Sequence, residues 1–255
     1  WTFVAPTLIA FLALTAVPFL ISILLSFVDW NFFSGLEKIK WVGLQHFVDM
    51  WDDDKFVQGL KNTFVYVIGI VPLSIILSLV FAYCMNGRIF GKKALRMMFF
   101  IPYISSVVAV GAVFKFLFRE EGIVNNVLLD LGLISEPLKW TIKKELSKIP
   151  IILLSVWCSI GYQLILFTAA MQNVPVSLYE AARIDGANSV KQFTKITLPM
   201  ISPTIFYLVI TRMMAVFKIF GSIDIFTAGT SIKSNISVVV RIYGQAFGDY
   251  NFGYA

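Results

Sequence analysis

The chain has 255 residues, of which 58% are hydrophobic and 14% are charged, and its formal net charge is +6. A soluble domain carries about 45–50% apolar and about 25% charged residues, so this composition excludes a water-soluble globule and a disordered chain. With two cysteines it also excludes a disulfide framework, which leaves an integral membrane protein.

Five apolar segments follow one another along the chain, each close to the roughly 20 residues that a helix needs to cross a bilayer. They lack the alternating pattern of a β-barrel, so we predict an all-α, polytopic helical bundle with membrane-spanning helices at 5–28, 62–85, 97–118, 149–171 and 199–220. Residues 1–61 form a predicted first region, made of the first helix and an outer loop. Residues 62–255 form a predicted core.

The two ends of the chain carry separate expectations. The first apolar segment is longer than the apolar region of a signal peptide and lacks a basic flank, so we expect it to be retained as a membrane anchor. The chain stops shortly after an apolar and aromatic stretch, so we expect a sixth span beyond residue 255.

The loop between the second and third spans sets the predicted orientation. Segment 86–96 holds four basic residues and no acid, whereas 29–61 holds six acids and four bases. Short loops rich in Lys and Arg stay in the cytoplasm. We therefore expect 86–96 and 172–198 to lie in the cytoplasm, and the N-terminus to be cytoplasmic as well.

The inner loop 173–198 contains signals for a pair of short helices. Ser177 with Glu180 reads as a capping box, so a helix is predicted to begin after Ser177. Asp185-Gly186 is a stop signal, and a second helix is predicted from 188–189 onward. By helix physics alone, an amphipathic connector lying along the membrane surface is an alternative interpretation.

The spacing of the same loop resembles the EAA motif of ATP-binding-cassette importer permeases. Glu180-Ala181-Ala182 is followed after three residues by Gly186, and after nine more by Ile196 and then Leu198-Pro199. In that family the loop is the coupling helix, which docks into a groove of a cytoplasmic ATPase subunit. The resemblance implies that Glu180 pairs with a basic residue of the ATPase and that Gly186 makes the turn. The residues it assigns to ATPase coupling are Tyr179, Glu180, Ala181, Ala182, Asp185, Gly186, Ile196, Leu198 and Pro199.

The resemblance extends over most of the chain and is closest to the maltose-type permeases. It rests on segments 3–6, 100–102, 122–128 and 244–255, and it implies the MetI-like permease fold. The segment after the fifth span departs from the family, which often has Phe-Asp and then Thr-x-Gly-Gly-Pro there. No site is placed on that segment.

Polar side chains within the apolar spans are candidates for a solute pathway. Ser155, Ser159 and Tyr162 follow i, i+4, i+7 spacing on the fourth span, with Gln163 beside them, which is typical of interhelical hydrogen bonding or of a sugar-facing wall. Arg212 lies near the middle of the fifth span, where structural pairing and solute contact are equal alternatives. By resemblance, Ser159 and Tyr162 fall where maltose-type permeases contact solute, and Arg212, Val216 and Ile219 fall at comparable positions. The predicted pathway is therefore Ser155, Ser159, Tyr162, Gln163, Arg212, Val216 and Ile219.

No residues resemble catalytic or metal-binding chemistry. The sequence has no phosphate-cradling loop with lysine and no nucleophile with a base, and His46 stands alone in a polar loop. We predict that the chain is not an enzyme, holds no cofactor or metal and binds no nucleic acid.

The resemblance implies a permease subunit of an ATP-driven importer in the bacterial cytoplasmic membrane, surrounded by lipid and carrying a sugar or oligosaccharide. The implied partners are a second homologous permease, two ATPase subunits that bind the ATP, and an extracytoplasmic solute-binding protein. One alternative is an importer of another polar solute such as glycerol phosphate. Another is an ion-driven secondary transporter, which needs intramembrane carboxylates, and none lies in the five predicted spans.

Overall fold

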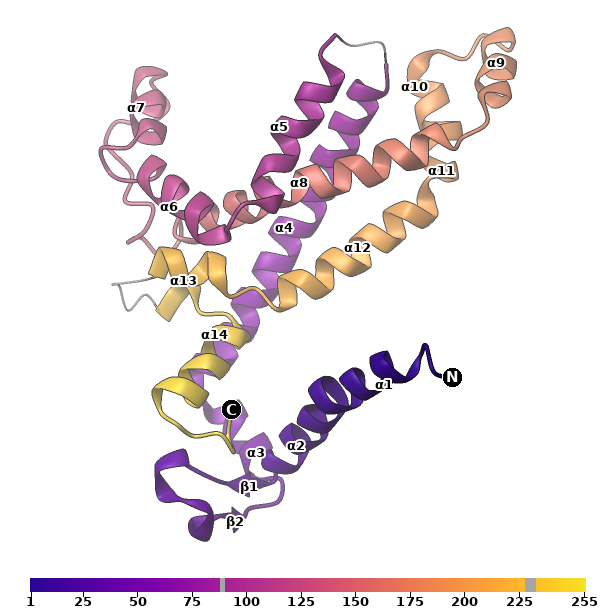
Figure 1. The fold of residues 1–255 in the computed structure, drawn as a ribbon. Coiled ribbons are helices and arrows are strands. Elements are labelled where there is room, and N and C mark those ends of the chain that lie inside the picture. The colour runs from indigo at the N-terminus through magenta and orange to yellow at the C-terminus, as the bar shows by residue number, and fades with distance from the viewer. Residues whose placement is uncertain (88–89, 228–232) are drawn as a thin grey trace. The chain divides into compact units, whose positions relative to one another are not determined.

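The computed structural model describes residues 1–87, 90–227 and 233–255 (Figure 1). In these ranges the chain is mainly helical, and its one sheet is a two-stranded pair of β1 (Val28–Asp29) and β2 (Lys40–Trp41). By length and composition, three helical segments can cross a membrane: Ala5–Leu25, α4 (Asp54–Asn86) and α8 (Lys148–Gln172). Two bent helix pairs could each make a further span. The all-α membrane class predicted from the sequence is confirmed.

The first helical segment joins α1 (Ala5–Phe11) to α2 (Val17–Leu25) through a π-helical turn at Leu12–Ala16. The turn directly precedes Pro18, which has no N–H to donate to an α-helical acceptor one turn back. The helix ends at Leu25 rather than at the predicted residue 28, because Val28 pairs with Trp41 in the antiparallel ladder.

The predicted span at 97–118 is not one continuous helix. The structure divides it into α5 (Lys92–Ile104) and α6 (Val107–Leu117), which are bent by 100° at Ser105 and Ser106. Ser106 has non-helical backbone angles, and its side-chain oxygen accepts a hydrogen bond from the backbone N–H of Val108 at 3.3 Å. Ser105 donates its hydroxyl to the carbonyl of Ile101 at 2.7 Å. Ser106 thus satisfies a backbone N–H that the break releases, whereas the Ser105 hydroxyl adds a second bond to a carbonyl that already accepts from the Ser105 N–H at 3.1 Å.

The predicted span at 199–220 also differs from the structure. The helical path from α10 (Ser189–Gln192) through the π turn Phe193–Thr197 to α11 (Leu198–Met200) meets α12 (Ser202–Phe217) at an angle of 66°. Pro203 lies in the first turn of α12 and cannot donate to the carbonyl of Pro199. The hydroxyl of Ser202 takes that place, at 2.8 Å. Because α12 ends at Phe217, Ile219 lies beyond it, ahead of α13 (Gly221–Thr227).

The described chain forms two compact units, Asn62–Asn235 and Trp1–Lys61 with Ile236–Ala255. The boundary after Lys61 coincides with the predicted one, but the last segment, expected in the core, packs with the N-terminal residues. In this smaller unit α3 (Gln45–Asp52) and α14 (Val238–Tyr243) are further helices.

A half-buried ion pair holds the two parts of the smaller unit together. Asp53 accepts hydrogen bonds from Arg241 at 2.8 and 2.6 Å and from the hydroxyl of Tyr254 at 3.2 Å. Burial raises the pKa of the Asp53 carboxyl, but the hydrogen bonds from Arg241 and from the backbone of Lys55 outweigh it, so that the pKa is lowered overall. The carboxylate therefore stays charged at neutral pH.

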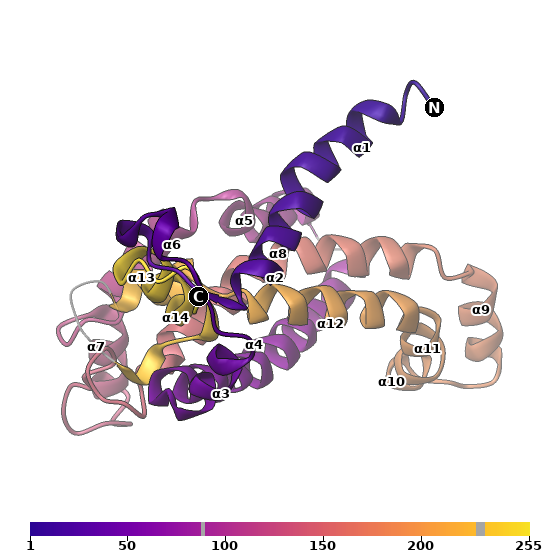
Figure 2. The ribbon, with the colours of Figure 1, turned by 90° about the horizontal axis from the view of Figure 1, so that it is seen from below.

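In the larger unit, α8 packs along α5 and beside α12, as both views show (Figures 1 and 2). Gly161 on α8 makes the close approach to α5 possible, since a Cβ there would contact the backbone oxygen of Phe99 and come within 2.7 Å of the Phe100 Cα. The Phe99 ring lies 4.9 Å from that of Phe81 and 6.2 Å from that of Trp157, so aromatic contacts surround the glycine. A short helix, α7 (Ile123–Asp130), follows α6.

Gly161→Ala should lower the thermal unfolding midpoint of the purified protein, because the added methyl forces α5 and α8 apart. Overpacking typically costs about 1–3 kcal/mol, and backbone atoms cannot move aside as a flexible side chain can. Gly244→Ala is the matched control, because a Cβ at Gly244 would meet nothing within 4 Å. Equal midpoints for the two variants would contradict the close approach.

Candidate functional site

The inner loop begins with α9 (Val176–Ile184), which starts directly after Pro175. The predicted capping box is wrong: no side chain caps this helix, and Ser177 already lies in its first turn. Pro175 is the residue at the helix boundary, and its carbonyl accepts a hydrogen bond from the N–H of Leu178 at 3.2 Å. Its fixed φ sets the entry of the chain into the helix without help from a side chain.

The end of α9 is a glycine turn, as the sequence predicts. Gly186 has φ +73°, the left-handed region that favours glycine. Its N–H donates to the carbonyl of Arg183 at 3.1 Å, and the N–H of Ala187 donates to that of Ala182 at 2.8 Å. This pair of bonds is the Schellman motif. The predicted start of the second helix is also confirmed, because Asn188 caps α10 by accepting from the N–H of Lys191 at 2.9 Å.

The residues of the EAA motif differ in exposure. Glu180, Ala181, Asp185, Gly186 and Pro199 are exposed, whereas Tyr179, Ala182, Ile196 and Leu198 are half-buried. The hydroxyl of Tyr179 lies 2.9 Å from that of Thr197 in the π turn. The Tyr179 side chain therefore braces α9 against the start of the next membrane helix instead of projecting outward.

One exposed face of α9 carries apolar residues that sequence reasoning did not single out. Val176, Glu180 and Ile184 follow i, i+4, i+8 spacing, and Val176 and Ile184 are 68% and 88% exposed. Val190 on α10 is similarly exposed. The spacing of these residues around Glu180 is the signal that could have found them. The loop thus presents one carboxylate between apolar side chains.

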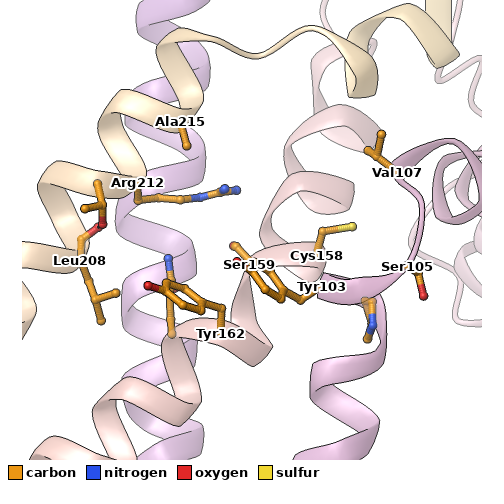
Figure 3. Close-up of a pocket in the computed structure, with 12 residues that line it drawn as sticks. Tyr103, Ser105, Val107, Cys158, Ser159, Tyr162, Leu208, Arg212 and Ala215 are labelled. Carbon is orange, nitrogen blue, oxygen red and sulfur yellow. The ribbon is translucent and has the colours of Figure 1, made fainter. Parts of the chain in front are cut away.

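Two adjoining cavities, of about 320 and 220 Å³, lie in the larger unit among α8, α12 and the α5–α6 break. Figure 3 shows the residues that line the larger one. The seven predicted pathway residues all line one or both of them. Ser159, Tyr162 and Gln163 line the larger cavity, and Ser155, Val216 and Ile219 line the smaller one. Arg212 lines both. The structure therefore brings the predicted set together, and its role in solute contact remains a prediction.

The break between α5 and α6 supplies a wall of the larger cavity that the sequence analysis missed. Pro102, Tyr103, Ser105 and Val107 line it. The ring of Tyr103 stacks on that of Tyr162, with centroids 5.1 Å apart and planes inclined by 16°. The sequence does not indicate that these residues face the fourth span, because it does not reveal the bend that brings them there.

Several polar side chains of the set are already engaged within the protein. Gln163 is 2% exposed; its side-chain oxygen accepts from Ser78 at 2.8 Å, and its amide donates to Ser74 at 3.3 Å. Ser159 donates to the carbonyl of Val156 at 2.8 Å. These bonds agree with the interhelical hydrogen-bonding alternative for Gln163, whose polar atoms hold α8 against α4.

Arg212 extends from α12 toward α8 in Figure 3. Its Nη2 donates to the backbone carbonyl of Ser155 at 2.7 Å. Among the described residues, no group of three or more His, Cys, Asp or Glu side chains could hold a metal ion.

Comparison with known proteins finds a matching family and related transport permeases. Residues 70–247 match the family described as binding-protein-dependent transport system inner membrane component. The chain is 35% identical to the lactose transport system permease protein LacF of Rhizobium radiobacter, over 95% of this chain and 80% of LacF. It is 33% identical to the probable ABC transporter permease protein YesP of Bacillus subtilis, over 100% of this chain and 82% of YesP.

A solved structure shares the fold. It is the bacterial alginate ABC transporter in complex with an alginate pentasaccharide-bound periplasmic protein. The TM-score to one of its chains is 0.81, at 26% identity, over 99% of this chain and 85% of that one.

Ser78→Ala should lower the thermal unfolding midpoint, because it leaves the buried oxygen of Gln163 without its 2.8 Å donor. An unsatisfied buried acceptor costs about 1–3 kcal/mol. Ser135→Ala is a suitable control, since it removes the same hydroxyl from an exposed position outside any helix or strand. A Ser78 variant as stable as the control would mean that the Gln163 amide is not structural.

Proposed function

Because the chain belongs to the family of binding-protein-dependent transport system inner membrane components, we propose that it imports a sugar or oligosaccharide as one permease subunit of an ATP-driven transporter. It is an ABC transporter permease of the sugar-transport kind and not an enzyme. The energy enters through the α9 loop, and the solute passes along the wall made by α8 and α12.

The observation that carries this proposal is the connection of the exposed loop to both cavity helices. The helix α8, which bears Tyr162, is separated from α9 only by residues 173–175. On the other side, α10 and α11 lead to α12, which bears Arg212. The Tyr179–Thr197 contact joins the two sides at 2.9 Å. A force that moves α9 therefore acts on both helices at once.

The α9 surface fits an ATPase partner. Burying Val176 and Ile184 in a groove would remove apolar surface from water, and a basic residue in the partner would pair with Glu180 between them. Two cytoplasmic ATPase subunits would bind and hydrolyse the ATP, and closure of their dimer would tilt the permease helices. The N-terminus and the α9 loop would then both lie on the cytoplasmic side of the bacterial membrane.

The proposed transporter also contains a second permease subunit and works with a solute-binding protein. The alginate transporter of the same fold was solved with a sugar-loaded periplasmic protein. By analogy, an extracytoplasmic binding protein would deliver the solute to this permease and a homologous partner permease. The aromatic pair Tyr103–Tyr162 offers a flat apolar face, and the hydroxyls around the larger cavity offer directional hydrogen bonds, which together suit a sugar ring.

Glu180→Lys should weaken ATPase attachment and lower transport about tenfold or more, because it replaces a charge-assisted bond with like-charge repulsion. Gly186→Pro should do the same, since proline cannot adopt the φ of +73° that the turn requires. Pull-down of the ATPase subunits and sugar uptake into proteoliposomes measure the two effects.

Glu136→Lys makes the same charge reversal at an exposed position of the predicted outer loop and serves as the matched control. If both loop variants retain ATPase attachment and uptake at the level of this control, the coupling role of α9 is wrong.

Tyr162→Ala should lower sugar uptake by about tenfold while the transporter still assembles, because it removes the stacked ring from the cavity. Tyr162→Phe keeps the ring and should retain more activity. The measurements are uptake and, for assembly, size-exclusion chromatography of the complex. Loss of assembly in Tyr162→Ala would indicate a packing role instead.

A further inference from the structure

We propose that the solute carried by this permease bears an anionic group and that Arg212 selects for it. This inference rests on the proposed importer function and names the class of its substrate. It concerns a polyhydroxylated solute with at least one acidic group, either a carboxylate as in a uronic acid or a phosphate ester.

Arg212 is the charged side chain of the solute path. It lines both cavities, and the other lining residues are apolar, aromatic, hydroxyl-bearing, thiol or amide residues, with no Asp or Glu among them. It lies mid-way along α12 (Ser202–Phe217), within an apolar helix. A charge at membrane depth is costly and is retained where it serves a pathway or pairs with another group.

The protein supplies little to balance this charge. Nη2 donates to a neutral carbonyl, that of Ser155, at 2.7 Å, and the buried Nε has no hydrogen-bond partner. No carboxylate in the described ranges lies within ion-pair distance of the guanidinium. Burial of an unpaired charge is unfavourable in proteins. An anion entering the cavity would supply the missing counter-charge.

Two other arginines of the chain differ from Arg212 in their partners or in their position. Arg241 is paired at 2.6 Å with Asp53, so this chain does provide a carboxylate where an arginine has a structural role. Arg96 also has buried nitrogens without partners, but it lines neither cavity. Arg212 alone among these three combines an uncompensated charge with a place on the wall of both cavities.

The surroundings of Arg212 specify more than a bare anion. The stacked rings of Tyr103 and Tyr162 and the hydroxyls of Ser159 and Thr211 line the same cavity. An inorganic ion would leave the aromatic face unused, and a neutral sugar would leave the guanidinium unpaired. A sugar acid or sugar phosphate uses both features.

The test is uptake by proteoliposomes that hold the complete transporter, with its partner permease, ATPases and binding protein. Three labelled probes are compared: maltotriose as the neutral sugar, trigalacturonate as the carboxylate and glucose 6-phosphate as the phosphate ester. Wild type should carry one of the two anionic probes in preference to maltotriose. The preferred probe tells which anionic group is recognised.

Arg212→Gln should lower uptake of that anionic probe at least about tenfold more than it lowers uptake of maltotriose, because a charge-assisted hydrogen bond to the anion is lost. Arg212→Lys should retain more anion uptake than the glutamine variant. Lys218→Gln removes the same formal charge from an exposed position just after the same helix and should behave as wild type. All variants share one binding protein, so the differences report on the permease.

Preference of the wild-type transporter for maltotriose over both anions would overturn the proposal, even if the glutamine variant failed to assemble. Equal losses of neutral and anionic uptake in an assembled Arg212→Gln transporter would overturn it as well. Failure of the anionic-solute proposal can be told apart from failure of the proposed importer function. An assembled, ATP-hydrolysing complex that carries none of the three probes contradicts the sugar importer itself, whereas uptake of maltotriose alone contradicts only the anionic class.

Discussion

Backbone hydrogen bonding within an apolar medium is the constraint on which the rest of this structure depends. In hydrocarbon, each N–H and C=O must find a partner inside the protein, so a helix can break only where another group replaces the lost bond. Both bent pairs meet this condition with serine. Ser106 accepts from the N–H of Val108, and Ser202 donates to the carbonyl that Pro203 cannot reach.

The breaks in turn create the site. Because α5 ends at Ile104 and α6 leaves at 100°, Tyr103 lies against Tyr162 and Val107 borders both cavities. The approach of α5 to α8 depends on the missing side chain of Gly161. The hydrogen bond from Ser78 to Gln163 and the one from Gln163 to Ser74 hold the other side of α8 against α4. The wall formed by α8 is thus held by hydrogen bonds to α4, and the opposite wall is formed by the break between α5 and α6.

The inner loop shows how local chemistry is linked to the membrane helices. The Schellman turn at Gly186 reverses the chain through backbone hydrogen bonds between neighbouring residues, whereas the contact of Tyr179 with Thr197 ties α9 to the start of the next helix. Under the proposed function, the exposed face of Val176, Glu180 and Ile184 would receive the force, and the short connections to α8 and α12 would pass it to Tyr162 and Arg212. Coupling and selection would then involve the same two helices.

The sequence by itself determined the class of the protein, the helical character of its spans and the α9–Gly186–α10 turn, because hydropathy, proline and glycine act over a few neighbouring residues. It also supplied seven lining residues, since helical spacing and a family resemblance place them on two helices. It did not reveal the breaks in the third and fifth spans, because a serine pair or a proline within an apolar run is compatible with a straight helix as well as a bent one. Only the tertiary structure decided that Tyr103 meets Tyr162, that Asp53 pairs with Arg241 and that Arg212 has no such partner. These pairings join residues far apart in the chain, and no local pattern encodes which distant side chains will meet.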